Sequence, residues 1–203
     1  MQKWIIKDHT LEFDDTTHIY YCDGVIIPSV TKIVHFAYPS TYQDIDPSIL
    51  KMAAELGTKM HKDIEDFENF KQVDNSPELD SYIKLKTFFK WNVKHSEIPI
   101  VVFNDNKPLC AGRIDQIITI NDEWYVNDLK RTKNVHHNNL KLQLSLYALG
   151  YEQCYGGEIN NGYCTHLRKD IGEFISIKLD KNKAIEKCLE YTKQIESEDE
   201  FEW

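Results

Sequence analysis

Apolar residues recur at two different spacings along this chain, and the change of spacing separates predicted helices from predicted strands. From residue 47 to residue 93 apolar side chains return every three or four positions, the period of a helix with one buried face. From residue 97 onward apolar and polar residues alternate, the period of a strand. Helices are predicted at about 47–70, 77–93, 137–153 and 181–195, and strands at about 97–104, 109–120, 123–130, 158–168 and 173–179.

Turn and capping residues mark the limits of several of these elements. Asp23-Gly24 lies between two short apolar runs and predicts the tight turn of a β-hairpin that spans 10–28. Ser29 is predicted to cap a short helix, because its hydroxyl accepts a hydrogen bond from a free N–H group of the first turn. Asp46 is predicted to cap the next helix in the same way. We therefore expect a hairpin and a helical segment in front of the main sheet.

The order of these elements predicts an α/β protein in which helices flank a central mixed sheet. The helix at 137–153 is placed to carry a crossover between parallel strands. No internal repeat or long linker divides the chain, and its 203 residues suit one domain, 1–203. A content of 41% hydrophobic residues is ordinary for a globular protein.

Neither an apolar run long enough for a membrane-spanning helix nor a secretory signal peptide is visible in the sequence. We therefore expect a cytoplasmic protein that has no membrane contacts. The five cysteines are odd in number and form no CxxC pair. They predict reduced, buried side chains in place of a disulfide framework or a structural zinc site.

The formal net charge of −9 counts against a protein whose whole surface binds nucleic acid. The distribution of charge changes this picture, because part of the acidic excess lies in the tail 196–203. We expect this tail to be either a frayed end or a docking peptide for a protein partner. Cationic residues gather instead after the third predicted strand of the sheet, at Lys130, Arg131, Lys133 and Lys141.

Two acids and a lysine lie on neighbouring strands of the predicted sheet. Asp115 lies within one strand, and Asp128 and Lys130 lie two positions apart at the end of the next, hence on one face. Two close carboxylates repel each other unless a cation lies between them, and oxygen-rich sites suit Mg²⁺ or Mn²⁺. Such a cation activates water and stabilises charge on a phosphate oxygen, and Lys130 is placed to orient that water. Since an isolated Asp-x-Lys is more often an exposed ion pair, the surrounding motifs decide.

Five short segments resemble motifs of the PD-(D/E)XK nuclease superfamily, and within it the RecB-type branch. In chain order they resemble the P-S-V-T segment of phage members, the G-T-x-x-H helix, the G-x-x-D strand, the apolar-x-D-x-K strand and the Q-x-x-x-Y helix. The segments are Pro28-Ser29-Val30-Thr31, Gly57-Thr58-Lys59-Met60-His61, Gly112-Arg113-Ile114-Asp115, Val126-Asn127-Asp128-Leu129-Lys130 and Gln143-Leu144-Ser145-Leu146-Tyr147. The resemblance covers about residues 18–150. Arg131 departs from the family, which often has threonine directly after the lysine.

The resemblance implies a restriction-endonuclease-like core whose central mixed sheet carries the site. It implies three catalytic residues, namely Asp115, Asp128 and Lys130. The implied metal ligands are His61, Asp115, Asp128, the main-chain carbonyl of Leu129 and, with a weaker match, Glu97. The substrate-binding residues are Gln143 and Tyr147, to which the cationic neighbours Arg131 and Lys133 are added.

The predicted activity is hydrolysis of DNA phosphodiester bonds with Mg²⁺ or Mn²⁺. The resemblance implies an exonuclease on single-stranded DNA or DNA ends, which serves replication or recombination of a phage or mobile element, in the host cytoplasm if phage-encoded. No iron–sulfur cluster is expected, because the cysteines beyond residue 150 are too far apart. Two alternatives stay open. One is an endonuclease of the same fold, and the other is a non-catalytic module of that fold that binds nucleic acid or inhibits a protein.

Overall fold

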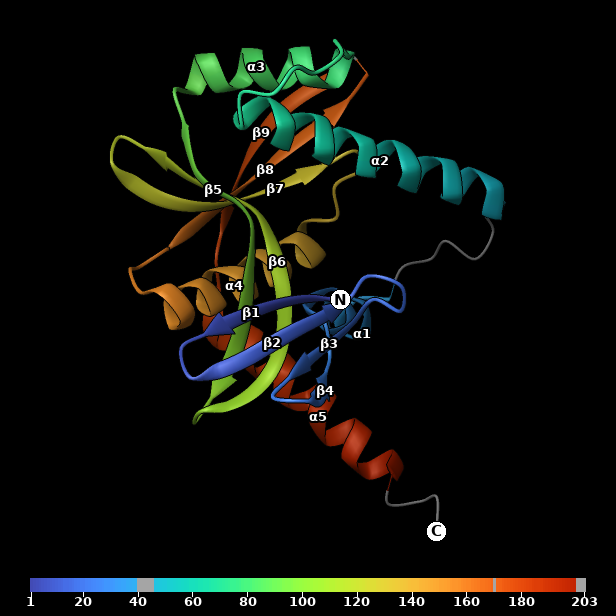
Figure 1. The fold of residues 1–203 in the computed structure, drawn as a ribbon, viewed down its shortest axis with the longest axis vertical. Coiled ribbons are helices and arrows are strands. Elements are labelled where there is room, and N and C mark those ends of the chain that lie inside the picture. Colours follow the sequence, from blue (N-terminus) through green and yellow to red (C-terminus); the bar gives the residue numbers. More distant parts are fainter. Residues whose placement is uncertain (40–45, 170, 200–203) are drawn as a thin grey trace.

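The computed structural model describes the backbone of residues 1–39, 46–169 and 171–199 (Figure 1). The acidic side chains of the predicted tail 196–203 lie outside this description. The strands are β1 Gln2–Ile6, β2 His9–Asp14, β3 Ile19–Cys22, β4 Val25–Ile27, β5 Asn92–Asn104, β6 Lys107–Ile120, β7 Glu123–Lys130, β8 Asn161–Arg168 and β9 Ile171–Lys178. The helices are α1 Val30–Ala37, α2 Pro47–Glu68, α3 Pro77–Phe89, α4 His137–Tyr155 and α5 Lys181–Asp199.

The main sheet has the strand order β5-β6-β7-β8-β9 and is mixed, as predicted. All neighbouring strands are antiparallel except β7 and β8, which are parallel. Helix α4 connects these two strands, because parallel neighbours need a crossover that returns the chain to the same end of the sheet. The fold class is therefore α/β.

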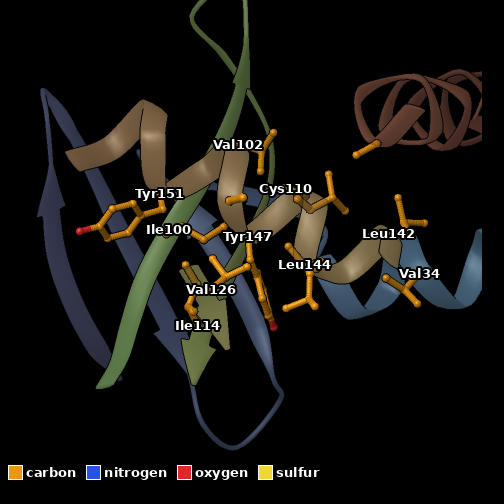
Figure 2. Close-up of a cluster of buried hydrophobic side chains, with 14 of the residues drawn as sticks. Val34, Ile100, Val102, Cys110, Ile114, Val126, Leu142, Leu144, Tyr147 and Tyr151 are labelled. Atoms are coloured by element: carbon orange, nitrogen blue, oxygen red, sulfur yellow. The ribbon is translucent and has the colours of Figure 1, made fainter. Parts of the chain in front are cut away.

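Helices cover both faces of this sheet (Figure 1). On one face α4 packs beside α1 and α5, with Val126 of β7 and Leu144 of α4 in the same buried cluster (Figure 2). On the other face α2 and α3 pack over Ile118 and Leu129. Because successive strand residues point to opposite faces, β6 and β7 contribute apolar side chains to both clusters.

Strands β1–β4 form a separate antiparallel sheet in sequence order. Its buried face packs against β5 and β6, where Leu11 and Tyr20 share a cluster with Val101 and Phe103. A short parallel bridge joins Ser29, just after β4, to Ala111 of β6, with Ala111 N–H donating to the Pro28 carbonyl at 3.0 Å. This contact fixes the start of α1 against the middle of β6.

The capping predictions are confirmed, while the number of N-terminal strands is larger than predicted. Ser29 Oγ accepts from Lys32 N–H at the start of α1, and Asp46 Oδ1 accepts from Ser48 N–H at the start of α2. The predicted hairpin is β3–β4, but β1 and β2 form a second hairpin before it. The turn of this second hairpin passes through Lys7, a residue without the glycine or asparagine signal of a tight turn.

Two boundaries also differ from the prediction. Helix α3 ends at Phe89, four residues before the predicted limit, because Lys90 takes a left-handed φ of 57°. Trp91 then turns into the core, and β5 begins at Asn92.

Helix α2 buries less than the predicted apolar face. Met60 and Ile64 in its second half are buried, whereas Ile49 and Met52 in its first half are 54% and 56% exposed. The first half extends beyond the sheet (Figure 1). In the part of the chain that the structure describes, no helix is long and apolar enough to cross a membrane.

Candidate metal centre

The two predicted catalytic acids lie where the pairing of β6 with β7 ends. The last paired residues are Gln116 and Asn127, so Asp115 and Asp128 each lie one position beyond the ladder. There Asp115 Oδ2 accepts the main-chain N–H of Leu129 at 2.7 Å. The Leu129 N–H thus bonds to a side-chain oxygen of β6 and not to a main-chain carbonyl of that strand. This hydrogen bond holds the Asp115 carboxylate against the backbone of the Asp-x-Lys segment.

A buried polar network holds the two strands behind these acids. Asn127 Nδ2 donates to Gln116 Oε1 at 2.9 Å, and Gln116 Nε2 donates to the Tyr82 hydroxyl at 2.9 Å. The Thr165 hydroxyl donates to Asn127 Oδ1, also at 2.9 Å. Because an unpaired buried amide costs about 1–3 kcal/mol, this network favours a single register of β6, β7 and β8. Sequence reasoning missed it, although a polar Gln116 and Asn127 inside apolar strands are its signal.

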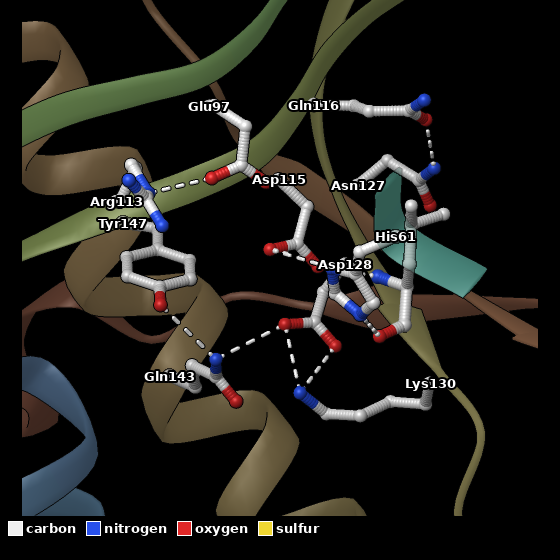
Figure 3. Close-up of polar contacts among 11 residues, drawn as sticks. His61, Glu97, Arg113, Asp115, Gln116, Asn127, Asp128, Lys130, Gln143 and Tyr147 are labelled. Atoms are coloured by element: carbon white, nitrogen blue, oxygen red, sulfur yellow. Dashed lines mark hydrogen bonds and ion pairs between the residues drawn. The ribbon is translucent and has the colours of Figure 1, made fainter. Parts of the chain in front are cut away.

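His61, Glu97 and Asp115 form a cluster in which the ligand atoms lie within 4.8 Å of one another (Figure 3). They come from α2, β5 and β6. His61 Nδ1 lies 3.7 Å from Asp115 Oδ1, and His61 Nε2 makes a 2.9 Å hydrogen bond with the Leu129 carbonyl oxygen. Four of the predicted metal ligands are thus neighbours in space, although α2 and β7 are far apart in sequence.

Glu97 lies in this cluster with an unusual backbone. Its φ is 52°, although the pairings Ser96–Gln116 and Ile98–Ile114 on either side keep the same register. A left-handed residue inside a strand costs on the order of 1 kcal/mol, and such strain often lies at functional sites. Burial and the charge of Asp115 raise the pKa of Glu97, and the guanidinium of Arg113 opposes this rise. Arg113 Nε lies 2.5 Å from Glu97 Oε2.

Asp128, Lys130, Gln143 and Tyr147 form a second group beside this cluster (Figure 3). Lys130 Nζ and Gln143 Nε2 both donate to Asp128 Oδ1, at 2.9 Å and 3.0 Å. Gln143 Nε2 also donates to the Tyr147 hydroxyl at 3.2 Å. Asp128 is 1% exposed, and burial raises its pKa to about 6 against the opposing effect of Lys130. Burial alone would lower the pKa of Lys130, but the charges of Asp128 and Asp115 outweigh it and raise that pKa.

One oxygen of this group has no hydrogen bond. Asp128 Oδ2 is buried and lies 2.7 Å from Lys130 Nζ, an ion-pair contact without hydrogen-bond geometry. The ammonium of Lys130 is thus a cation that already lies beside this buried oxygen. Asp128 is not in the group of ligand atoms within 4.8 Å of one another that His61, Glu97 and Asp115 form. Those two carboxylates and one imidazole make a donor set rich in oxygen with one nitrogen. Such a set fits Mg²⁺ or Mn²⁺.

A cleft of about 550 Å³ opens onto the His61 cluster. Its walls come from β2 and β3, the first turn of α1, the middle of α2, strands β5 and β6, and α4. The lining residues are Phe13, His18, Tyr20, Ser29, Val30, Thr31, Gly57, Thr58, His61, Glu97, Gly112, Arg113, Asp115 and Tyr147. The N-terminal sheet and the Pro-Ser-Val-Thr segment thus form the wall opposite the acids, an arrangement that the sequence did not predict.

The other two predicted substrate-binding residues, Arg131 and Lys133, lie outside the cleft. Arg131 Nε donates to Glu78 Oε1 at 2.8 Å, and its side chain is 16% exposed. The guanidinium of Arg131 therefore contacts α3 and does not line the cleft, which gives no support to substrate binding. Lys133 is exposed on the loop before α4, outside the cleft lining. Arg113, which was predicted only as part of a motif, is a cleft residue.

Fold and site together define an α/β protein with an acid-and-histidine cluster at the base of a cleft. No model of a known protein family matches this chain, and no curated protein matches it. Among solved structures, the chain is similar to the one described as "Crystal structure of SSO0001". The two are 20% identical with a TM-score of 0.46, over 82% of this chain and 75% of that one. A likeness this weak carries no argument about activity, so the function has to be argued from the site itself.

Proposed function

We propose that this protein is a metal-dependent nuclease with a restriction-endonuclease-like core, which hydrolyses phosphodiester bonds of DNA. The observation that carries the proposal is the convergence of His61, Glu97, Asp115 and the Leu129 carbonyl beside the Asp128–Lys130 pair. These groups come from four separate elements. A structural ion-pair network would not need a left-handed Glu97.

Each residue has a distinct task in this proposal. Asp115, Asp128, His61 and the Leu129 carbonyl hold the divalent cation, with Glu97 beside them. When bound, the cation supplies Lewis acidity toward a phosphate oxygen and a water of lowered pKa. The residues around it position this water and the phosphate.

Lys130 is the proton-bearing group of the set. Its side chain is 30% exposed, and its Nζ is paired with Asp128. Its raised pKa keeps it an ammonium, which donates hydrogen bonds to the attacking water or to a phosphate oxygen as negative charge develops there. Gln143 fixes Asp128 from the opposite side and thereby sets the direction of the carboxylate.

DNA as the substrate, and a preference for single strands or ends, follow from the resemblance to the RecB-type branch of the PD-(D/E)XK nucleases. So does a role in phage or mobile-element DNA metabolism. The negative total charge does not decide against this proposal, because the distribution of charge matters more than the total. The acids that line the cleft are Glu97 and Asp115, and they face Arg113 and two histidines.

A cleavage assay with Mn²⁺ and a linear single-stranded oligonucleotide tests the proposal. Asp128→Ala and Lys130→Ala are each expected to lower the rate by at least a hundredfold, since each removes a group that acts on the transition state. Lys187→Ala is the matched control, because Lys187 lies on α5 and pairs with Glu190 at the surface. Full activity of a folded Asp128→Ala or Lys130→Ala protein would contradict the mechanism.

The same assay separates the alternatives. Equal cutting of circular and linear single strands identifies an endonuclease. The net charge of −9 favours a second candidate, a non-catalytic binding module built on the same fold. Binding of the oligonucleotide without cleavage in either Mg²⁺ or Mn²⁺ would identify that module.

A further inference from the structure

Arg113 is a cation inside the cleft that the proposed catalytic set leaves without a task. Among the described residues that line the cleft, it is the one lysine or arginine. Its side chain is 35% exposed, so it is neither a core residue nor a free surface cation. We therefore ask what a partly exposed arginine does at the edge of an acidic cluster.

Three contacts hold the guanidinium in place. Nε lies 2.5 Å from Glu97 Oε2, Nη1 donates to Gln2 Oε1 at 3.3 Å, and Cζ lies 6.0 Å from the centre of the Phe13 ring. The last two contacts come from the N-terminal sheet, which forms the opposite wall of the cleft. The group is therefore oriented in advance and needs little further ordering to bind a ligand.

Glu97 takes part in two sets of contacts. Its carboxylate pairs with Arg113 and also belongs to the cluster with His61 and Asp115, whose ligand atoms lie within 4.8 Å of one another. A divalent cation in that cluster competes with Arg113 for the same negative charge. Cation binding therefore weakens the hold of Glu97 on the guanidinium.

We propose that Arg113 binds a phosphate group of the substrate, and that Glu97 holds Arg113 in position until a divalent cation takes up the charge of Glu97. This inference rests on the proposed nuclease function and adds the contact that holds the substrate backbone. A planar guanidinium presents two parallel N–H groups to two phosphate oxygens, a geometry that an ammonium lacks.

One wall of the cleft near Arg113, in the part of the chain that the structure describes, lacks acidic groups that would repel an anion. The wall formed by the N-terminal sheet and α1 contributes Phe13, His18 and Tyr20, and among the described residues no acid of that wall lines the cleft. The predicted alternatives for the backbone contact are less suitable, because Arg131 is paired with Glu78 and Lys133 lies outside the cleft.

Binding of a single-stranded oligonucleotide of twelve thymidines, labelled at its 3′ end, tests the proposal by fluorescence anisotropy. Ca²⁺ replaces Mn²⁺, and a gel confirms that the probe stays intact. Arg113→Gln is expected to bind about tenfold more weakly, the size of one hydrogen bond to a charged group. The slope of log affinity against log salt is expected to become shallower by about 0.7, since one phosphate contact is lost.

Two further variants give the matched comparison. Arg113→Lys keeps the charge and is expected to keep the salt slope with an intermediate affinity. Lys187→Gln removes one positive charge from α5, far from the cleft, and is expected to bind as the wild type does. An equal loss for Arg113→Gln and Lys187→Gln would mean that total charge alone matters, which overturns the proposal.

Glu97→Gln supplies a readout that a merely structural ion pair would not give. In EDTA this variant is expected to bind the probe several-fold more tightly than the wild type, because Arg113 is released and one negative charge is gone. If the pair only stabilised the fold, loss of either partner would weaken binding. Weaker binding by Glu97→Gln in EDTA therefore overturns the proposal, even if Arg113→Gln fails to fold.

Failure of this inference is distinguishable from failure of the nuclease proposal. If the wild type cleaves DNA but Arg113→Gln binds the probe with unchanged affinity and slope, the role of Arg113 is wrong and the nuclease stands. If the wild type neither cleaves nor binds the probe, both fall together.

Discussion

Asp128 is a buried carboxyl group, and its burial makes the stability of the protein depend on pH. It is 1% exposed and hydrogen-bonded by Lys130 and Gln143, yet burial still raises its pKa to about 6. The ordinary value is 3.8, so protonation is easier in the folded chain than in the unfolded chain. Folding therefore takes up a proton between these two pKa values, and stability falls as the pH rises through this window.

Asp128→Asn removes the buried charge and is expected to stabilise the protein in EDTA at neutral pH. The gain over the wild type should be near zero below pH 4 and reach roughly 2–3 kcal/mol above pH 6. The substitution also leaves Lys130 without its charged partner. This loss costs less free energy than removal of the buried charge gains, because the Lys130 side chain is 30% exposed and can turn to water. Urea unfolding at several pH values measures the difference, with the exposed turn variant Asp105→Asn as control. A gain that does not change with pH would contradict the raised pKa.

Two glycines in the family-like motifs differ in what surrounds them. A Cβ added at Gly112 would lie 2.9 Å from Tyr147 Cε1 and 3.1 Å from Val30 Cγ2. A Cβ added at Gly57, inside α2, would meet nothing within 4 Å. Gly112 is thus required by packing within the chain. Gly57 leaves open space on the wall of the cleft.

The same substitution should therefore have opposite effects at these two positions. Gly112→Ala is expected to destabilise by about 1–3 kcal/mol, because Tyr147 and Val30 must shift. Gly57→Ala is expected to stabilise by about 0.5–1 kcal/mol, since alanine favours the helix. Urea unfolding measures both. A destabilised Gly57→Ala would show that the glycine has an intramolecular task that the structure does not reveal.

At the scale of elements, helix α3 and strand β8 hold Arg131 and Thr132, the two residues that follow β7. Arg131 pairs with Glu78 of α3, whose carboxylate also accepts the N–H of Lys169 at 3.3 Å. His166 of β8 contacts the Thr132 carbonyl through Nε2 at 2.7 Å. These contacts fix the direction in which the chain leaves Lys130, and so support the position of the lysine. Arg131 is in this sense an anchor of the site.

A double-mutant cycle tests this anchor. Glu78→Gln and Arg131→Gln are each expected to cost about 2 kcal/mol, because each leaves a mostly buried charge without its partner. The double variant is expected to cost clearly less than the sum of the two. The free energies come from urea unfolding. Additive losses would mean that the two side chains do not interact in solution.

At the scale of the whole molecule, one cleft is built from two sheets. The main sheet and its helices supply the acids, His61 and Tyr147, while β2, β3 and the start of α1 supply the opposite wall. The two sheets share a buried apolar cluster that includes Leu11, Tyr20, Val101 and Phe103. Since this contact is apolar and fully buried, we expect the N-terminal sheet to unfold together with the core.

Hydrogen exchange followed by mass spectrometry checks this expectation. Amides of β2 and β3 should exchange with the same opening free energy as those of the middle of β6, because the two sheets belong to one cooperative unit. The exposed first half of α2 should exchange faster and serves as the internal comparison. Opening of the N-terminal sheet at a free energy lower by 2 kcal/mol or more would divide the chain into two units and contradict a single domain.

Local patterns predicted the elements well where the apolar periodicity extended over many residues or a capping residue was present. Strand β7 matches its predicted range, and the caps Ser29 and Asp46 each accept the expected main-chain N–H. Strands β1 and β2 were missed, because the turn between them lacks a recognisable sequence. The first half of α2 was predicted as a helix but not as an exposed one, since an apolar period indicates a helix face but not whether a partner covers it.

The sequence by itself determined the chemical groups of the candidate site and their order along the chain. The alternation of side chains puts Asp128 and Lys130 on one face of a strand, and the turn of a helix puts Gln143 beside Tyr147, because both relations depend only on local geometry. The roles of these residues stay predictions until cleavage is measured.

Only the tertiary structure decided which distant groups meet. The contact of His61 with the Leu129 carbonyl, the Glu97–Arg113 pair and the wall made by Phe13 and Tyr20 all join segments that lie far apart in sequence. In the tertiary structure Arg131 pairs with Glu78 outside the cleft, whereas Arg113 lines the cleft. The physical reason is that burial and ion pairing depend on which surfaces cover one another, and no local period encodes that.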